Sequence, residues 1–190
     1  MRPYSDFELI EQVLAGNRQS YATLVDRHQQ FVISVAIKFL GDLEEAKDVG
    51  QEVFVVLWQN LTKFNPEFEL RTWLYTITSR RCLDVMKSSR YKKMERSELI
   101  HFIETKDSQN PHGVLADKEF VCILLSLVHQ LPAKQKAVFV LAKLEGIENT
   151  AIAEMLDMST GNVKSLLYYA CLRMTQLLSA YYEMEKEKWL

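Results

Sequence analysis

The sequence predicts an all-α protein made of two small helical domains joined by a flexible linker. Apolar residues recur at spacings of three and four over long stretches, as in amphipathic helices, whereas the alternation typical of strands is scarce. Six Gly and four Pro among 190 residues leave few positions at which a helix must end. The hydrophobic share of 48% is that of an ordinary globular protein, so these helices have enough apolar side chains to form a core.

Four helices are expected in the first half of the chain. Ser5 and Glu8 have the spacing of a capping box and start a short helix. The second helix is expected over about 20–40, and the third begins at Asp42. The fourth is expected over about 70–93, and it follows a loop that contains an Asn-Pro pair, which disfavours helix.

The second half is expected to form a helix-turn-helix unit. One helix covers about 117–130, and the next opens at Leu131-Pro132, because proline is tolerated in a first turn. A short helix around Ile152 then leads through a tight turn into a long helix from Thr160. The spacing of its apolar residues predicts one buried face, made of Val163, Leu167, Ala170, Met174 and Leu177. A short helix, a tight turn and a second helix form the helix-turn-helix pattern, although an ordinary helical hairpin gives the same pattern.

The domain boundaries follow from a change in composition. Residues 94–116 are mostly polar and contain the breakers Asn110-Pro111 and Gly113, so they are read as the linker. The first domain is therefore placed at 1–93, and the second at 117–190, where it includes a C-terminal helical tail.

Several classes of protein are made improbable by what the sequence lacks. No apolar run approaches the roughly 20 residues of a membrane span, and the start has no apolar signal core, so a cytoplasmic location is expected. Cys82, Cys122 and Cys171 form no CxxC pair, and the four His are scattered, so neither a metal site nor a disulfide framework is expected. No nucleophile–base pair or phosphate-binding loop is visible, and neither catalytic residues nor a cofactor are predicted.

Charge is distributed unevenly although the net charge is only −2. An acidic helix is followed by a basic one, which suggests two different partner surfaces. The stretch 42–52 holds the acids Asp42, Glu44, Glu45, Asp48 and Glu52 against Lys47, and 71–93 holds Arg71, Arg80, Arg81, Lys87, Arg90, Lys92 and Lys93 against Asp84.

Two constellations in the first half could carry function. Asp48 and Glu52 lie four residues apart on one helix face beside Gln51, and such a face can receive Arg or Lys from a partner. A solvated surface would give the same spacing. Phe64 and Trp73 stand beside the basic helix, which suits single-stranded nucleic acid, since cations follow phosphates and rings stack on bases. A core Phe and Trp beneath a solvated basic face is the alternative.

Taken together, these motifs resemble those of extracytoplasmic-function sigma factors, over about 9–93 and 118–178. The second conserved region of that family is similar to the run from Asp48 to Trp58, to Phe64, to Arg71-Thr72-Trp73-Leu74-Tyr75 and to Asp84. Its fourth region is similar to Leu131-Pro132, Gly146-Ile147, Ile152-Ala153-Glu154 and Val163-Lys164-Ser165. Both blocks in this order, with a linker between them, are far more specific than either alone.

The resemblance implies a dissociable subunit of RNA polymerase that directs core enzyme to promoter DNA and melts it. It implies contact with the clamp helices of the polymerase's largest subunit through Asp48, Gln51, Glu52 and Trp58. It implies −10 DNA binding by Lys63, Phe64, Asn65, Arg71, Trp73, Arg80, Arg81 and Lys87. It implies −35 DNA binding by a helix that carries Thr160, Asn162, Lys164, Ser165 and Tyr168, in a domain that also touches the polymerase flap. An anti-sigma protein is an expected further partner.

The expected −35 helix is poor in positive charge. Leu166, Tyr169 and Cys171 stand where relatives commonly have Arg, so the −35 contact is expected to be weak in charge. Specificity would then depend on neutral donors and acceptors of the helix. The alternative is that lysines of the preceding helix restore the charge, namely Lys134, Lys136 and Lys143.

Two other functions fit parts of the sequence. A stand-alone helix-turn-helix regulator explains the second half but leaves the basic and aromatic stretch at 64–93 without a role. A helical enzyme or scaffold with a chance pattern predicts no association with polymerase at all.

Overall fold

The computed structural model describes residues 4–88 and 114–187, and over these ranges the protein is helical without a strand, as the sequence predicts. The predicted basic residues Arg90, Lys92 and Lys93 lie outside the described residues, as does most of the predicted linker. The first group of helices is α1 (Asp6–Leu14), α2 (Arg18–Leu40), α3 (Leu43–Asn60), the 3₁₀ turn η1 (Leu61–Lys63) and α4 (Leu70–Lys87). The second group is α6 (Val114–Val128), α7 (Ala133–Phe139), the π-helical turn η3 (Val140–Leu144), α8 (Asn149–Met155) and α9 (Thr160–Glu187).

The ends of the first helices are set by local side-chain chemistry. Ser5 and Glu8 form the predicted capping box, since the Ser5 hydroxyl accepts from the Glu8 amide and the Glu8 carboxylate accepts from the Ser5 amide. The Asp42 carboxylate accepts from the Glu45 amide at 2.7 Å and starts α3. Gly41 ends α2 with a φ of +73°, a left-handed conformation that glycine adopts without strain.

The core of the first group lies where α2, α3 and α4 meet, and α1 packs on α2. Leu24, Phe39, Val53, Leu57 and Leu74 are fully buried there. Burying each Leu or Phe contributes about 1.5–3 kcal/mol, so these contacts hold the helices in fixed register.

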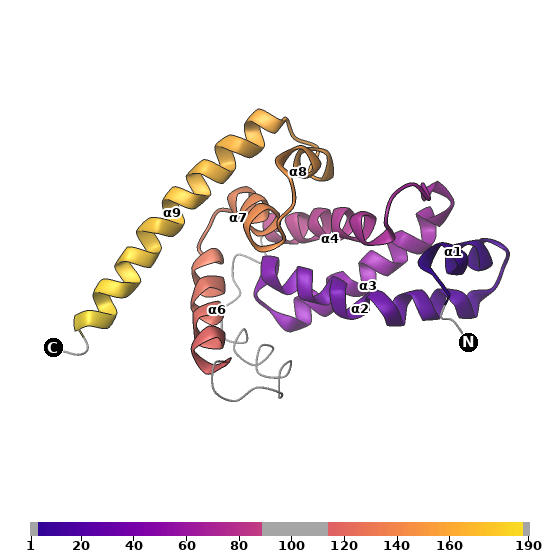
Figure 1. Cartoon of the computed structure of the whole chain (residues 1–190), viewed down its shortest axis with the longest axis horizontal. Coiled ribbons are helices and arrows are strands. Elements are labelled where there is room, and N and C mark those ends of the chain that lie inside the picture. The colour runs from indigo at the N-terminus through magenta and orange to yellow at the C-terminus, as the bar shows by residue number, and fades with distance from the viewer. Residues whose placement is uncertain (1–3, 89–113, 188–190) are drawn as a thin grey trace.

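The second group folds around the helix-turn-helix. Its buried side chains include Leu141, Ile152, Val163 and Ala170, of which Val163 and Ala170 belong to the predicted inward face of α9. The turn between α8 and α9 passes through Asp157, whose φ is +53°. Figure 1 shows α9 as one long helix whose C-terminal part extends away from α7 and α8.

The two groups are in contact with each other. Figure 1 shows α7 and α8 beside α4, and side chains from both groups bond across this boundary. The contact thus joins two halves that the sequence separates by a long polar stretch.

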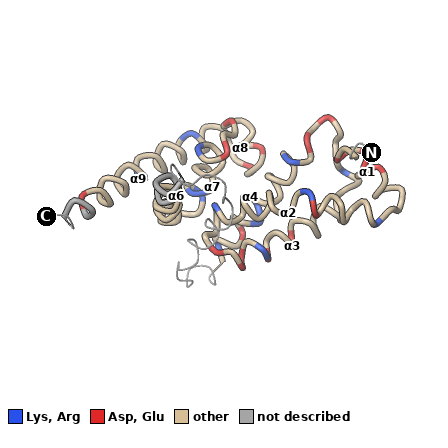
Figure 2. The backbone as a smooth tube through the Cα atoms, turned by 60° about the horizontal axis from the view of Figure 1, so that its bottom comes forward, with Lys and Arg blue, Asp and Glu red and all other residues tan. Residues whose placement is uncertain are grey.

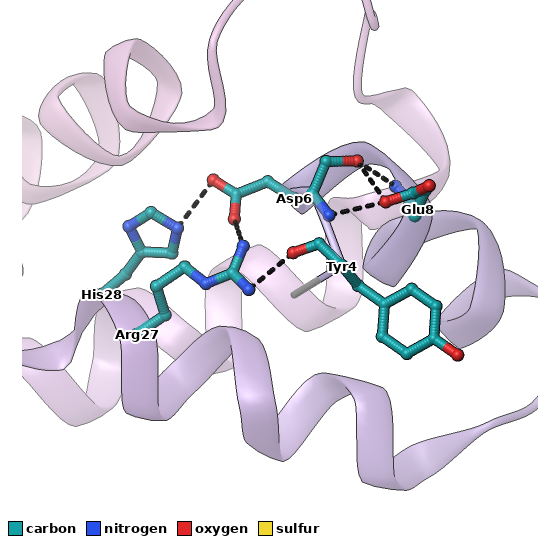
Figure 3. A network of polar contacts seen from close by, with 6 residues as sticks. Tyr4, Asp6, Glu8, Arg27 and His28 are labelled. Carbon is teal, nitrogen blue, oxygen red and sulfur yellow. Dashed lines mark hydrogen bonds and ion pairs between the residues drawn. The ribbon is translucent and has the colours of Figure 1, made fainter. Parts of the chain in front are cut away.

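A small polar network fastens α1 to α2 at the far end of the first group (Figure 3). The Asp6 carboxylate accepts from the Arg27 guanidinium at 2.5 Å and lies 2.8 Å from His28 Nε2. Arg27 also donates to the Tyr4 carbonyl at 2.7 Å. The side chains of Arg27 and Asp6 keep 33% and 29% of their exposure, so solvent screens the pair and its contribution is modest.

We expect Asp6→Ala to lower the free energy of unfolding by about 1 kcal/mol, because it removes a partly screened ion pair and leaves Arg27 without its carboxylate. Urea unfolding followed by circular dichroism measures the change. Asp26→Ala is the matched control, since Asp26 is an exposed carboxylate on α2. Equal losses in the two variants would contradict a role for the network.

Candidate functional site

One exposed face of α3 combines acids with apolar side chains. Asp48, Gln51 and Glu52 are exposed, as the helical spacing predicts. Trp58 follows on the same face with 45% of its surface exposed, and Val55 lies between them with 55% exposed. Exposed apolar groups among charges are typical of a protein-binding surface. Val55 was not among the predicted residues, although its position three residues after Glu52 marks it as a member of this face.

The ring of Trp58 is held in place by a neighbouring tyrosine of α2. It packs edge to face on Tyr21, with 4.7 Å between ring centroids. Tyr21 in turn donates its hydroxyl to the Phe54 carbonyl of α3, and burial raises the pKa of Tyr21 to about 12. A ring with a fixed orientation loses little entropy when a partner covers it, so Trp58 suits a contact at the centre of an interface.

The loop between η1 and α4 presents a different aromatic residue from the one predicted. Phe64 is half-buried and stacks on Trp73, with ring centroids 5.6 Å apart and planes 27° apart. Phe68 is 63% exposed and is the more accessible ring of the loop. The Asn65 side chain accepts from the Glu67 amide at 3.0 Å and so shapes the turn that presents Phe68. Sequence reasoning missed Phe68, whose only signal was an aromatic residue between two acids in a loop.

A cavity of about 510 Å³ opens beside this loop. It lies between α1, the middle of α2 and the start of α4, and its walls combine aromatic rings with charges of both signs, since Asp6 and Glu69 line it beside Arg27 and Arg71. The residues that line it include Phe7, Arg27, His28, Phe64, Phe68 and Arg71. The cavity is large enough for a planar heterocycle, and its rings and guanidinium groups are the chemistry that holds unstacked bases.

Among the predicted cations, Arg71 contacts a ring of the first group, whereas Arg80 reaches the second group. The Arg71 guanidinium lies over the Phe31 ring at 4.1 Å from its centroid. Arg80 donates from Nε to the Met155 carbonyl at 2.7 Å, at the end of α8.

The other predicted cations pair within the first group. Arg81 lies 3.8 Å from Glu52 and joins α4 to the acidic face of α3. Lys87 reaches Asp84 at 3.4 Å, and Lys63 donates to the Asn60 side chain at 2.9 Å.

The helix-turn-helix exposes the predicted side chains of α9. Asn162, Lys164, Ser165 and Tyr168 are exposed, and Thr160 is half-buried. The face is nearly neutral, as expected, and no Lys or Arg other than Lys164 stands at its first turns. In Figure 2, Lys and Arg positions are interspersed with Asp and Glu positions along the backbone of both groups.

The alternative source of charge on the preceding helix is only partly available. Lys136 is 3% exposed, with Nζ 3.4 Å from His129 Nδ1, so it cannot reach a ligand at the surface. Lys134 and Lys143 are exposed. Leu166 and Cys171 are half-buried against the core, which makes Tyr169, 56% exposed, the accessible position of the three that lack Arg.

The three cysteines play no visible part in these surfaces. Burial raises the pKa of the Cys82 thiol far above its ordinary value, and Cys122 and Cys171 are half-buried and free.

Within residues 4–88 and 114–187, no three His, Cys, Asp or Glu side chains come together in a way that could hold a metal ion. In the same part of the chain, none of the helices combines the length and apolar character of a bilayer span.

The predicted residues therefore gather on three surfaces. The acidic face of α3 and the loop with α4 belong to the first group of helices, and they are joined through Arg81 and Glu52. The exposed face of α9 belongs to the second group. The chemistry of the three surfaces suits a basic protein partner, unstacked bases and a DNA groove, respectively.

Two family profiles match the chain, and together they cover more than half of it. Sigma-70 region 2 matches residues 24–91, and Sigma-70 region 4 matches residues 123–174. The first match contains α3, the loop and α4, and the second contains the helix-turn-helix.

Curated proteins align with the chain over most of its length. The RNA polymerase sigma-H factor of Pseudomonas aeruginosa is 26% identical over 176 residues, which are 87% of this chain and 89% of that protein. The ECF RNA polymerase sigma-E factor of Haemophilus influenzae is 25% identical over 173 residues, 87% of this chain and 91% of that protein. The ECF RNA polymerase sigma factor SigW of Bacillus subtilis is 24% identical and covers 84% of this chain and 89% of its own length.

Two solved structures share the fold. CnrH, determined in complex with the cytosolic domain of CnrY, superposes with a TM-score of 0.62 at 23% identity, over 90% of this chain and 96% of that one. The sigma factor RpoE of Bartonella quintana, determined with the anti-sigma factor NepR, gives a TM-score of 0.62 at 17% identity, over 85% and 98%.

Proposed function

Because this chain belongs to the sigma-70 family, as a transcription initiation factor of the extracytoplasmic-function type, we propose how its three surfaces divide the work of initiation. The acidic face of α3 binds core RNA polymerase. The loop at 64–69 and α4 open and read the −10 element, and α9 contacts the −35 element. The observation that carries this division is that each surface lies within a matched sigma region and has the chemistry its role requires. Co-purification with core polymerase, followed by run-off transcription, tests whether the chain acts as an initiation factor.

The polymerase contact is assigned to α3 because that face has both charge and a fixed aromatic anchor. Asp48 and Glu52 offer carboxylates to the Arg or Lys of a basic helix pair, such as the clamp helices of the largest subunit. Val55 and Trp58 would exclude water from those ion pairs, which strengthens them. The flap of the polymerase is a second contact, made by the helix-turn-helix domain.

The −10 contact is assigned to the cavity beside the 64–69 loop. Phe68 and Phe64 would stack on unpaired bases, while Arg71 and Lys63 follow phosphates. Trp73 stacks on Phe64 and contributes to base binding by holding the Phe64 ring in place. Arg80, Arg81 and Lys87 of α4 are the other cations assigned to −10 DNA binding.

An anti-sigma protein is a further proposed partner of this chain. CnrH was solved with the cytosolic domain of CnrY, and the sigma factor RpoE was solved with the anti-sigma factor NepR. The second complex supports an anti-sigma partner for this chain. We further infer that the protein acts in the cytoplasm with the polymerase. It works by binding, without a catalytic step or a cofactor of its own.

We expect the double variant Asp48→Lys/Glu52→Lys to weaken binding to core polymerase by at least about a hundredfold, since removal of a buried, hydrogen-bonded charge pair costs 2–5 kcal/mol or more. Both acids are exposed in the free chain, so its melting temperature should barely change. Affinity is measured by fluorescence titration with core enzyme. The control Glu11→Lys/Asp26→Lys makes the same charge change on α1 and α2, and equal affinities for the two double variants would refute the assignment.

We expect Phe68→Ala to lower permanganate reactivity of the −10 thymines by about tenfold, because stacking on an aromatic ring is worth about 1–3 kcal/mol per base. Phe64→Ala should lower both reactivity and thermal stability, since Phe64 also packs on Trp73. The measurement uses holoenzyme on a promoter that it transcribes. Phe120→Ala, which removes a 48% exposed ring from α6, is the control. Unchanged reactivity in Phe68→Ala would exclude this ring from strand opening.

We expect the charge-poor −35 contact to show in the salt dependence of promoter binding. Tyr169→Arg should make the slope of log affinity against log salt steeper by about 0.9, the value of one neutralised phosphate, and should tighten binding. The control is Tyr182→Arg, at another exposed tyrosine of α9 that lies roughly 20 Å further along the helix. Identical slopes for both variants would mean that Tyr169 does not face DNA.

A further inference from the structure

The cavity beside the loop between η1 and α4 has charged groups in its wall, and most of them are already engaged within the protein. Its lining includes the acids Asp6 and Glu69 and the cations Arg27 and Arg71. Asp6 and Arg27 bond each other, and the second carboxylate oxygen of Asp6 lies 2.8 Å from His28 Nε2 (Figure 3). The charges on the α1 and α2 side of the cavity therefore serve to hold α1 on α2.

Glu69, on the α4 side, is different. Arg71 beside it lies over the Phe31 ring, but Glu69 is exposed and its carboxylate does not cap α4, although it directly precedes that helix. Across residues 4–88 and 114–187, this carboxylate has neither a hydrogen bond nor an ion pair. The dipole of α4 favours an acid at this position, which is the purely structural explanation for Glu69.

A carboxylate in this wall is the wrong group for following a DNA strand. Phosphates repel it, whereas the neighbouring rings of Phe64 and Phe68 can stack on any base, since every base has a π face. Glu69 therefore disfavours nucleic acid in the cavity unless the base that enters donates a hydrogen bond to it. A charged group that is satisfied by some ligands and left unpaired by others confers specificity rather than affinity.

The bases differ in whether they can donate to such a group. A base that has left the duplex presents its Watson–Crick edge. Cytosine, adenine and guanine each carry an exocyclic amino group, and amino groups of bases donate to the carboxylates of Glu and Asp. Thymine has no amino group, and the one N–H of its edge lies between two carbonyl oxygens that repel a carboxylate. The cavity should therefore discriminate against thymine.

We propose that Glu69 is a specificity-determining residue of the −10 contact, which accepts a hydrogen bond from the exocyclic amino group of a base in this cavity and so selects against thymine. The inference rests on the proposed role of the cavity in −10 binding. It assigns the carboxylate to base selection, while Phe64 and Phe68 supply stacking to whichever base enters.

The test measures base preference with holoenzyme. Run-off transcription is compared on promoters that carry each of the four bases in turn at every −10 position. Glu69→Gln keeps the shape of the side chain, and its amide can donate to a thymine carbonyl as well as accept from an amino group. Glu11→Gln is the matched control, because it makes the same charge change at an exposed position of α1 that does not line the cavity.

At one −10 position we expect the wild type to transcribe promoters with amino-bearing bases about tenfold better than the thymine promoter, the discrimination of one good base contact. Glu69→Gln should reduce this ratio to about twofold by improving the thymine promoter, and Glu11→Gln should keep it.

Three results would overturn the selection by Glu69. The first is a Glu69→Gln chain that keeps every base preference of the wild type. The second is an equal loss of preference in Glu11→Gln, which would reduce the effect to net charge. The third is slower transcription by Glu69→Gln from all four promoters by one common factor, which would leave Glu69 its structural role at the start of α4 alone. Absence of any run-off with the wild-type chain and core polymerase would instead refute the proposed function itself.

Discussion

The burial of one stripe of α3 against α2 is the constraint on which the first group of helices depends. Val53 and Leu57 are fully buried in that seam, and at Gly50 an added Cβ would come within 3.3 Å of the Ile33 side chain. Close approach of the two helices leaves α3 no freedom to rotate. Since the helical period is 3.6 residues, the burial of Val53 and Leu57 dictates that Asp48 and Glu52 face outward. The apolar core thus orients the charged surface, and the acids contribute little to holding it there.

The same periodicity made much of the fold predictable from sequence. Capping residues such as Ser5, Asp42 and Gly41 act within a few residues of chain, so the helix ends they set could be read directly. The inward face of α9 was predicted for the same reason, because Val163 and Ala170 repeat at helical spacing. The helix-turn-helix of region 4 could be identified because its turn and its apolar positions also lie close together in sequence.

What the sequence did not reveal depends on contacts between side chains of different structural elements. Phe64 and Phe68 are both loop aromatics, and only the position of Trp73 decides that Phe64 is covered and Phe68 is exposed. Lys136 was a candidate cation for DNA, yet folding buries it beside His129. Local spacing carries no information on such pairs, since a helix position is exposed or buried only relative to its tertiary neighbours.

Glu145 is the strongest example, because its pairing joins residues more than one hundred positions apart in the chain. In the sequence it is one of several acids that precede α9. Glu148, Glu154 and Asp157 remain exposed there, and only Glu145 meets a cation and a hydroxyl on the other group of helices. An ion pair of this kind is weak as a source of stability, because desolvation offsets most of its attraction, but it is directional and easily broken by a competing partner. The pair therefore helps to set how the two groups of helices are oriented more than how strongly they adhere.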